Sequence, residues 1–309
     1  MGGIHHRVPS MLRLLPALVV SGLLLSAPVL SADPPPVLTY KDLLARPKVT
    51  GGVRVTYGSD AQQFGDLWLP AGAGPHPVLV LIHGGCWLGD VPAFELMNPM
   101  AKALSDAGIA VWNIEYRRLG QPGGGYPGTF QDVSAAMEQV RALAEPHKLD
   151  LTRVAVAGHS AGGHLAVWAA GRALLPKGSP LYKADALPVT GVVSLAGIVD
   201  LRDYRARGPA ACGGPETVDK LIGAATRGEA AFADTSPGEA PAKSLSLTLI
   251  SGTRDIIVPP TFAQAYGAKA LGPGLRELEI DGAGHFELID PQSGAWAVIQ
   301  AEIRDRLRR

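Results

Sequence analysis

The chain has 309 residues, of which 47% are hydrophobic and 18% are charged. This length allows one large domain with a substantial apolar core, or two small ones. Basic and acidic residues each number 28, and the basic residues form no run. Proteins that bind nucleic acids usually have an excess of clustered basic residues that contact the phosphates. The composition therefore argues against a nucleic acid as partner.

The first 31 residues have the pattern of a secretory signal peptide. Arg7 and Arg13 precede the apolar stretch 14–25, and small residues surround Ser31; Met11 offers an alternative start. This order predicts cleavage after Ser31 or one residue later. The alternative is a membrane anchor, but the stretch is shorter than the roughly 20 residues of a span. We expect a secreted or periplasmic protein with no stable membrane span after cleavage.

Two segments lie between the signal peptide and the main body of the chain. Residues 32–50 are expected to form an extended leader, because they begin with the stiff run DPPPV. The main domain is expected to cover residues 51–309. Its first strands are predicted at 53–57 and 64–69, where apolar and polar residues tend to alternate.

Continuous apolar runs follow, which is typical of strands buried on both faces of a parallel sheet. These predicted strands cover residues 78–82, 109–114, 154–157, 192–196 and 245–250, and a further strand is predicted at 275–280. Helices are predicted between and after them at residues 95–107, 130–144, 161–174, 260–271 and 291–307. For the last helix, Asp290 is the expected N-cap and Pro291 the first residue. The alternation predicts an α/β fold with a mostly parallel central sheet and helices on both faces.

A long interval without a predicted strand covers about residues 201–243. An interval of this length in a compact domain is usually a lid or a binding insertion, so we expect a small lid here. It contains Cys212, and the only other cysteine of the chain is Cys86. One disulfide is therefore possible and would tie the lid to the loop around Cys86; two free thiols are the alternative.

The segment VAVAGHSAGG, residues 154–163, places Ser160 between a predicted strand and a predicted helix. Gly158 and Gly162 leave room for a sharp turn that exposes the serine hydroxyl, and the amides of the helix N-terminus face whatever binds it. This context predicts that Ser160 is a nucleophile. An N-cap serine is the alternative, but it would not account for both glycines.

A serine nucleophile needs a base, and the base needs a carboxylate that orients it. His285 follows the predicted strand 275–280 in a glycine-rich loop, so it is expected at the carboxyl edge of the sheet, where such folds bind ligands. Asp255 follows the strand 245–250 and is the expected orienting carboxylate; Asp281 is the alternative.

The motif HGGCW follows the predicted strand 78–82 directly. Glycine allows backbone amides to face a substrate oxygen, so Gly85 and Cys86 are predicted oxyanion donors, together with the amide of Ala161. His83 is expected to brace this loop by hydrogen bonds rather than to act as a base.

Four further side chains lie close to these motifs or to the end of a predicted strand in the sequence. Trp87 and Tyr116 could each line the substrate pocket or pack in the core. His159 adjoins the serine in sequence and is expected to point away from it. His164 lies in the first turn of the next helix and is expected to pack or to form a structural hydrogen bond.

Four segments together resemble the α/β-hydrolase superfamily: HGGCW (83–87), GHSAGG (158–163), GTRDIIVP (252–259) and GAGHFE (282–287). They are most similar to its small HGG-motif esterase and lipase branch, which includes carboxylesterases, feruloyl and acetyl esterases and kynurenine formamidases. The resemblance covers roughly residues 50–309. It implies an α/β-hydrolase fold and a triad in the chain order Ser160, Asp255, His285, with neither cofactor nor metal. Lipase-type relatives have glycine where this chain has Cys86.

The expected function is hydrolysis of small to medium carboxylic esters through an acyl-enzyme on Ser160. Three alternatives remain: an arylformamidase, a serine peptidase, and a binding protein without activity on the same fold. The last is the weakest, because both Ser160 and His285 are present. The sequence does not indicate an oligomeric state.

Overall fold

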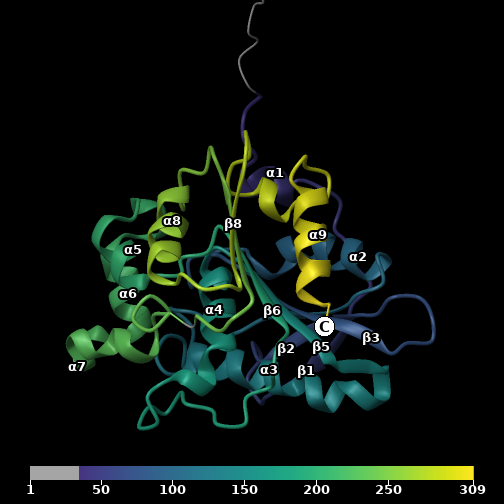
Figure 1. Cartoon of the computed structure of the whole chain (residues 1–309), viewed down its shortest axis with the longest axis horizontal. Helices are drawn as coiled ribbons and strands as arrows, with labels where there is room; N and C mark the ends of the chain where they lie inside the picture. The colour runs from purple at the N-terminus through teal and green to yellow at the C-terminus, as the bar shows by residue number, and fades with distance from the viewer. Residues whose placement is uncertain (1–34, 242, 309) are drawn as a thin grey trace, which may run out of the picture. The chain divides into compact units, whose positions relative to one another are not determined.

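The computed structural model describes residues 35–241 and 243–308, so the predicted signal peptide lies outside the described residues. Its centre is an eight-stranded sheet with the order β1-β2-β4-β3-β5-β6-β7-β8 (Figure 1). The strands are β1 (Val53–Thr56), β2 (Phe64–Trp68), β3 (His76–Ile82), β4 (Ala110–Ile114), β5 (Leu149–His159), β6 (Gly191–Leu195), β7 (Leu247–Gly252) and β8 (Leu275–Ile280).

The pairing of the strands follows the hydrophobic pattern. β1 pairs with β2 and β2 with β4 in antiparallel fashion, whereas every pairing from β4 through β3 to β8 is parallel. Every residue of β4 and β6 is buried, as continuous apolar runs require when both faces of a sheet are covered. The predicted mostly parallel sheet is confirmed.

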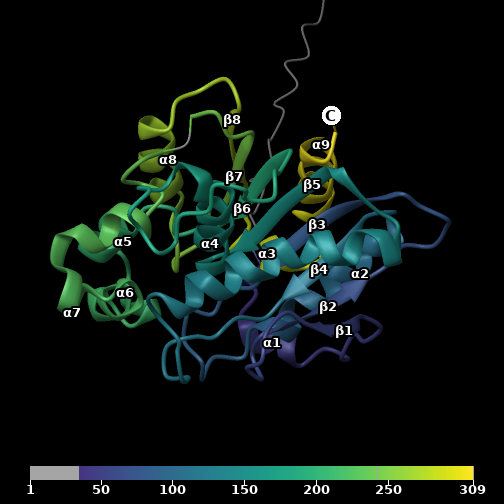
Figure 2. The ribbon, with the colours of Figure 1, turned by 90° about the horizontal axis from the view of Figure 1, so that it is seen from below.

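Helices cover both faces of this sheet. α4 and α9 both contact β5 and β6, and they lie on opposite sides of the strands (Figure 2). α3 packs beside α4. The helices are α1 (Tyr40–Leu44), α2 (Asn98–Asp106), α3 (Gly128–His147), α4 (Ala161–Ala170), α5 (Leu201–Arg207), α6 (Pro215–Ile222), α7 (Ala224–Arg227), α8 (Pro260–Lys269) and α9 (Trp296–Arg306).

The strand order fixes where a ligand can bind. The chain leaves β3 toward β4 on one side and returns to β5 on the other, so the sheet has a topological switch point between β3 and β5. Open α/β sheets form their ligand crevice at such a point, beyond the carboxyl ends of the strands. The HGGCW loop follows β3 and Ser160 follows β5, so both lie at this crevice.

Three sequence predictions about helices are wrong. The leader is not extended throughout, because residues 40–44 form α1, which begins with a Thr39 capping box. The helix predicted at 161–174 ends at Ala170 and continues only as a short 3₁₀ turn. The helix predicted at 291–307 begins at Trp296 with Ala295 as its N-cap, so Asp290 caps nothing.

The predicted lid covers residues 201–243, and residues 201–234 of it form helices and 3₁₀ turns. It contains α5, α6 and α7, with a 3₁₀ turn at Ala210–Cys212 and another at Gly228–Asp234. These short helices lie together at one end of the sheet (Figures 1 and 2). No helix among residues 35–241 and 243–308 combines the length and apolar character that crossing a bilayer requires.

Candidate active site

Ser160 occupies a sharp turn between β5 and α4. Its backbone angles are φ 56° and ψ −119°, a conformation that costs free energy for any residue with a side chain. A Cβ atom at Gly158 would lie 2.1 Å from the Gly162 carbonyl oxygen, and one at Gly162 would lie 2.2 Å from the Ile82 carbonyl oxygen. Only glycine fits at either position, so both glycines of the motif are needed for the turn that presents Ser160.

His285 and Asp255 form a buried pair. The imidazole Nδ1–H donates to Asp255 Oδ2 at 2.6 Å. The other carboxylate oxygen accepts the backbone amides of Ile257 and Val258 at 2.8 and 2.9 Å. These contacts fix the carboxylate and the ring, and they leave Nε2 as the basic nitrogen of His285. Asp281, the alternative carboxylate, is exposed and accepts a hydrogen bond from the Thr253 hydroxyl instead.

Ser160 and His285 line one pocket with a volume of about 300 Å³. Gly84, Gly85 and Cys86 of the loop after β3 form part of the same wall. Much of the remaining lining is apolar, as is usual in sites that hold small organic ligands. It includes Leu88, Val91, Leu96, Met97 and Ile289.

The loop after β3 has an unusual backbone. Gly85, Cys86 and Trp87 have φ values of 90°, 54° and 58°, so three consecutive residues adopt the left-handed region. None of the hydrogen bonds among the described residues uses the amide of Gly85, Cys86 or Ala161 as donor. Ala161 is also the first residue of α4, where amides have no partner within the helix. These amides are therefore available to an anionic oxygen in the pocket.

Cys86 and Cys212 are joined by a disulfide. The bond crosses 126 residues of sequence and ties the loop after β3 to the lid. Closing so long a loop contributes on the order of 2–4 kcal/mol to stability. It also holds Ala211, the residue next to Cys212, in the pocket wall.

His159 does not point away from the site, as the sequence predicted. It lines the pocket, and its ring centroid lies 4.4 Å from that of His285. Its Nε2–H donates to the His285 backbone carbonyl at 3.0 Å. Burial lowers the pKa of His159 well below its ordinary value, so this ring is neutral and positive charge that develops in the site stays on His285.

The leader also contributes to the site, which the sequence did not predict. Tyr40 of α1 lines the pocket and contacts the ring of Phe286, with 6.3 Å between the centroids. The Leu38 amide donates to Glu287, and the Arg46 guanidinium forms an ion pair with Asp290. The leader is therefore attached by these contacts to the loop that carries His285.

Trp87 and Tyr116 do not line this pocket. Both side chains are fully buried, and the Tyr116 hydroxyl donates to the His83 carbonyl at 3.0 Å. The packing interpretation therefore holds for both. His164 is also buried, and its Nε2 bonds the Thr235 carbonyl at 2.7 Å at the end of the lid. Its predicted structural hydrogen bond is present.

Sequence comparison relates the chain to a protein family and to several esterases. The sequence profile of the BD-FAE family matches residues 66–269. Esterase LipC of Mycobacterium tuberculosis is 30% identical over 252 residues, which cover 77% of this chain and 60% of LipC. Carboxylesterase NlhH of the same species is 34% identical over 115 residues, which cover 37% of this chain and 35% of NlhH.

Solved structures show the same fold. The crystal structure of esterase B from Lactobacillus rhamnosis superposes with a TM-score of 0.70 at 22% identity, over 86% of this chain and 90% of that one. At this identity the likeness establishes the α/β-hydrolase fold alone. The matched region of this chain spans less than two thirds of the length of LipC and of NlhH. The family profile covers well over half of this chain, which therefore belongs to the BD-FAE family.

Proposed function

We propose that the protein hydrolyses carboxylic esters, with Ser160 as nucleophile, His285 as general base and acid, and Asp255 as the orienting carboxylate. One observation carries the proposal: a strained serine and a carboxylate-paired histidine share one pocket. Serine hydroxyls gain nucleophilic character when a positioned base removes their proton. The esterases LipC and NlhH support the same reaction class.

The proposed reaction has two halves. The Ser160 hydroxyl attacks the ester carbonyl while His285 Nε2 takes its proton, and the oxygen of the tetrahedral intermediate becomes negative. The amides of Gly85, Cys86 and Ala161 are the proposed donors to that oxygen. The imidazolium then protonates the leaving alcohol, which departs and leaves an acyl-serine. Water, activated by the same histidine, releases the acid and restores Ser160.

The pocket favours a short acyl group. Its volume of about 300 Å³ lies at the lower end for ligand pockets, and its lining includes the apolar side chains of Leu96 and Met97. An ester is uncharged before attack, so its burial among apolar side chains needs no counter-charge. A charged substrate would need an oppositely charged group in the pocket. We therefore propose small to medium esters as the substrate class.

A substrate panel with an active-site probe tests the proposed function. We expect hydrolysis of p-nitrophenyl acetate and butyrate, a decline in kcat/KM toward long acyl chains, and labelling by a fluorophosphonate. Acetylated and feruloylated sugars in the same panel identify the alcohol that is preferred. Faster turnover of N-formylkynurenine or of a peptide than of every ester would overturn the ester assignment.

We also propose that the protein acts outside the reducing cytoplasm. The disulfide between Cys86 and Cys212 supports this, because such bonds persist in oxidising compartments, and the N-terminal sequence pattern supports export. We expect intact mass measurement of the exported protein to show a chain that begins at Ala32 or one residue later. An exported chain that still carries Arg7 and Arg13 would contradict it.

A further inference from the structure

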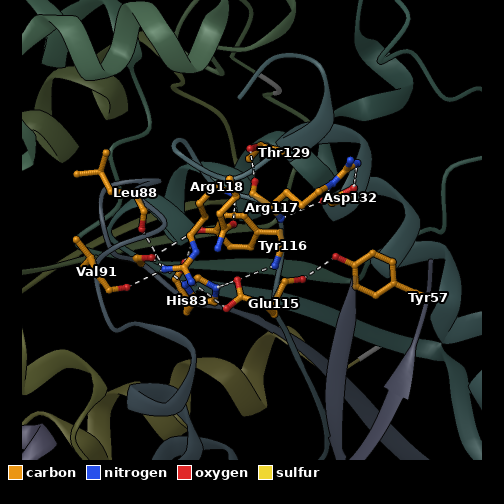
Figure 3. Close-up of polar contacts among 12 residues, drawn as sticks. Tyr57, His83, Leu88, Val91, Glu115, Tyr116, Arg117, Arg118, Thr129 and Asp132 are labelled. Atoms are coloured by element: carbon orange, nitrogen blue, oxygen red, sulfur yellow. Dashed lines mark hydrogen bonds and ion pairs between the residues drawn. The ribbon is translucent and has the colours of Figure 1, made fainter. Parts of the chain in front are cut away.

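The loop with the proposed oxyanion donors is held by the segment that follows β4 (Figure 3). The Tyr116 hydroxyl donates to the His83 carbonyl at 3.0 Å. At the far end of the loop, Arg118 Nη1 donates to the carbonyls of Leu88 and Val91 at 3.1 and 2.8 Å. The loop is thus fixed at both ends by one short segment, and His83 lies at its beginning.

Both ring nitrogens of His83 face oxygen atoms. Nδ1 lies 2.8 Å from the Gly84 carbonyl oxygen, and Nε2 lies 2.8 Å from Oε1 of Glu115. A carbonyl oxygen can only accept a hydrogen bond, so Nδ1 must carry a hydrogen for this contact to be favourable. The ring is completely buried, so no solvent competes for either nitrogen.

Whether Nε2 of His83 carries a hydrogen depends on whether Glu115 is ionised. Oε1 also accepts the backbone amide of Tyr116 at 2.8 Å, and Oε2 accepts Nη2 of Arg118 at 3.1 Å (Figure 3). The Tyr116 amide and the Arg118 guanidinium can only donate, so both contacts require Glu115 to act as an acceptor. Burial raises the pKa of Glu115, whereas the Arg118 guanidinium and the Tyr116 amide both lower it and stabilise the charged carboxylate. Glu115 is therefore an ionised acceptor, and Nε2 of His83 must also carry a hydrogen.

We propose that His83 is a buried imidazolium that positions the Gly84–Gly85 peptide for catalysis, an inference that rests on the proposed function. In a trans peptide the carbonyl oxygen and the next amide hydrogen point in opposite directions. When Nδ1–H holds the Gly84 oxygen, the Gly85 amide points away from the ring. Gly85 lines the pocket, and in this proposal its amide, turned away from the ring, donates to the substrate oxygen.

The charge of the cluster has a second effect. Glu115 is negative whereas Arg118 and His83 are positive, so these three residues together carry one net positive charge. The Tyr116 ring stacks on the His83 ring with 4.4 Å between centroids, which stabilises a cation. A fixed positive charge in a dry site stabilises an oxyanion more than the neutral ester.

Nitrogen NMR of the full chain with ¹⁵N-labelled histidine tests the charge state directly. We expect both His83 nitrogens to show the protonated signature at pH 7.5, with the signals assigned by their loss in His83→Asn. The half-exposed His76 and His147 serve as internal references for imidazoles that contact solvent. An unprotonated nitrogen in His83 would overturn the proposal. The spectrum needs no substrate, so its outcome is independent of whether esters are hydrolysed.

Kinetic measurements on two variants distinguish an effect of the charge on His83 from a purely structural effect. Glu115→Gln keeps the shape but removes the counter-charge, so we expect His83 to lose a proton and kcat to fall by about 10- to 100-fold, with KM changed by less than about threefold. The matched control is Asp132→Asn. Asp132 is a buried carboxylate that binds Arg117 on the same segment at 2.7 Å and makes no contact with His83. Equal losses in the two variants would show a structural role alone and overturn the proposal.

Discussion

Replacing Ser160 with alanine is expected to lower kcat by about 10⁵- to 10⁶-fold, the size of effect that removal of a serine nucleophile has in other hydrolases. The residual rate comes from the oxyanion donors and from binding, which the substitution leaves in place. Alanine fits the same turn, because the positive φ of Ser160 penalises both residues alike. The thermal unfolding temperature should therefore change little while fluorophosphonate labelling disappears.

Ser194 provides the matched control for this variant. It is a buried serine on β6, next to β5, and its hydroxyl has no hydrogen-bond partner among the described residues. Removal of an unpaired buried hydroxyl costs little, so Ser194→Ala should retain full activity and labelling. Labelling that persists in Ser160→Ala, or is lost in Ser194→Ala, would contradict the assignment of the nucleophile.

The parts of this protein that could be predicted from sequence depend on local patterns. A continuous apolar run such as residues 78–82 must be buried on both faces, and this is sufficient to identify β3. The turn at Ser160 is also local, because the two glycines that permit it lie within two residues. Asp255 and His285 were predicted to meet because each follows a parallel strand, and parallel strands bring their carboxyl ends to one edge.

The parts that were missed depend on contacts between distant segments. Asp290 followed by proline is a normal start for a helix, but the carboxylate binds Arg46 and the Gln292 amide, so the helix begins later. The contribution of Tyr40 depends on the docking of the leader against Phe286, which lies far away in the chain. His159 was misplaced for a related reason, since its direction is set by the His285 carbonyl and not by its neighbours in sequence.

The role of Glu115 could be predicted only in part from the sequence. Glu115 follows β4 directly, and His83 follows β3 directly, so both residues lie at the same edge of the sheet. Nothing local revealed that one carboxylate would accept hydrogen bonds from His83, Tyr116 and Arg118 together. That arrangement requires the parallel pairing of β3 with β4, which brings Ile82 opposite Ile114 and so places His83 near Glu115.

The second large effect is expected at Asp255. Asp255→Asn preserves the shape and can still accept the Ile257 and Val258 amides through its carbonyl oxygen. The amide nitrogen would then face His285 Nδ1 and donate to it, which moves the ring proton to Nε2 and removes the base. We expect kcat to fall by about 10⁴-fold, with little change in stability.

Asp281→Asn is the control for this substitution, because Asp281 was the competing carboxylate and is exposed. Its loss should leave kcat within about twofold of the wild type, as is usual for surface substitutions away from a site. If the large loss followed Asp281→Asn and Asp255→Asn stayed active, the orienting role would belong to Asp281. The buried contact of 2.6 Å between Asp255 and His285 would then have no part in catalysis.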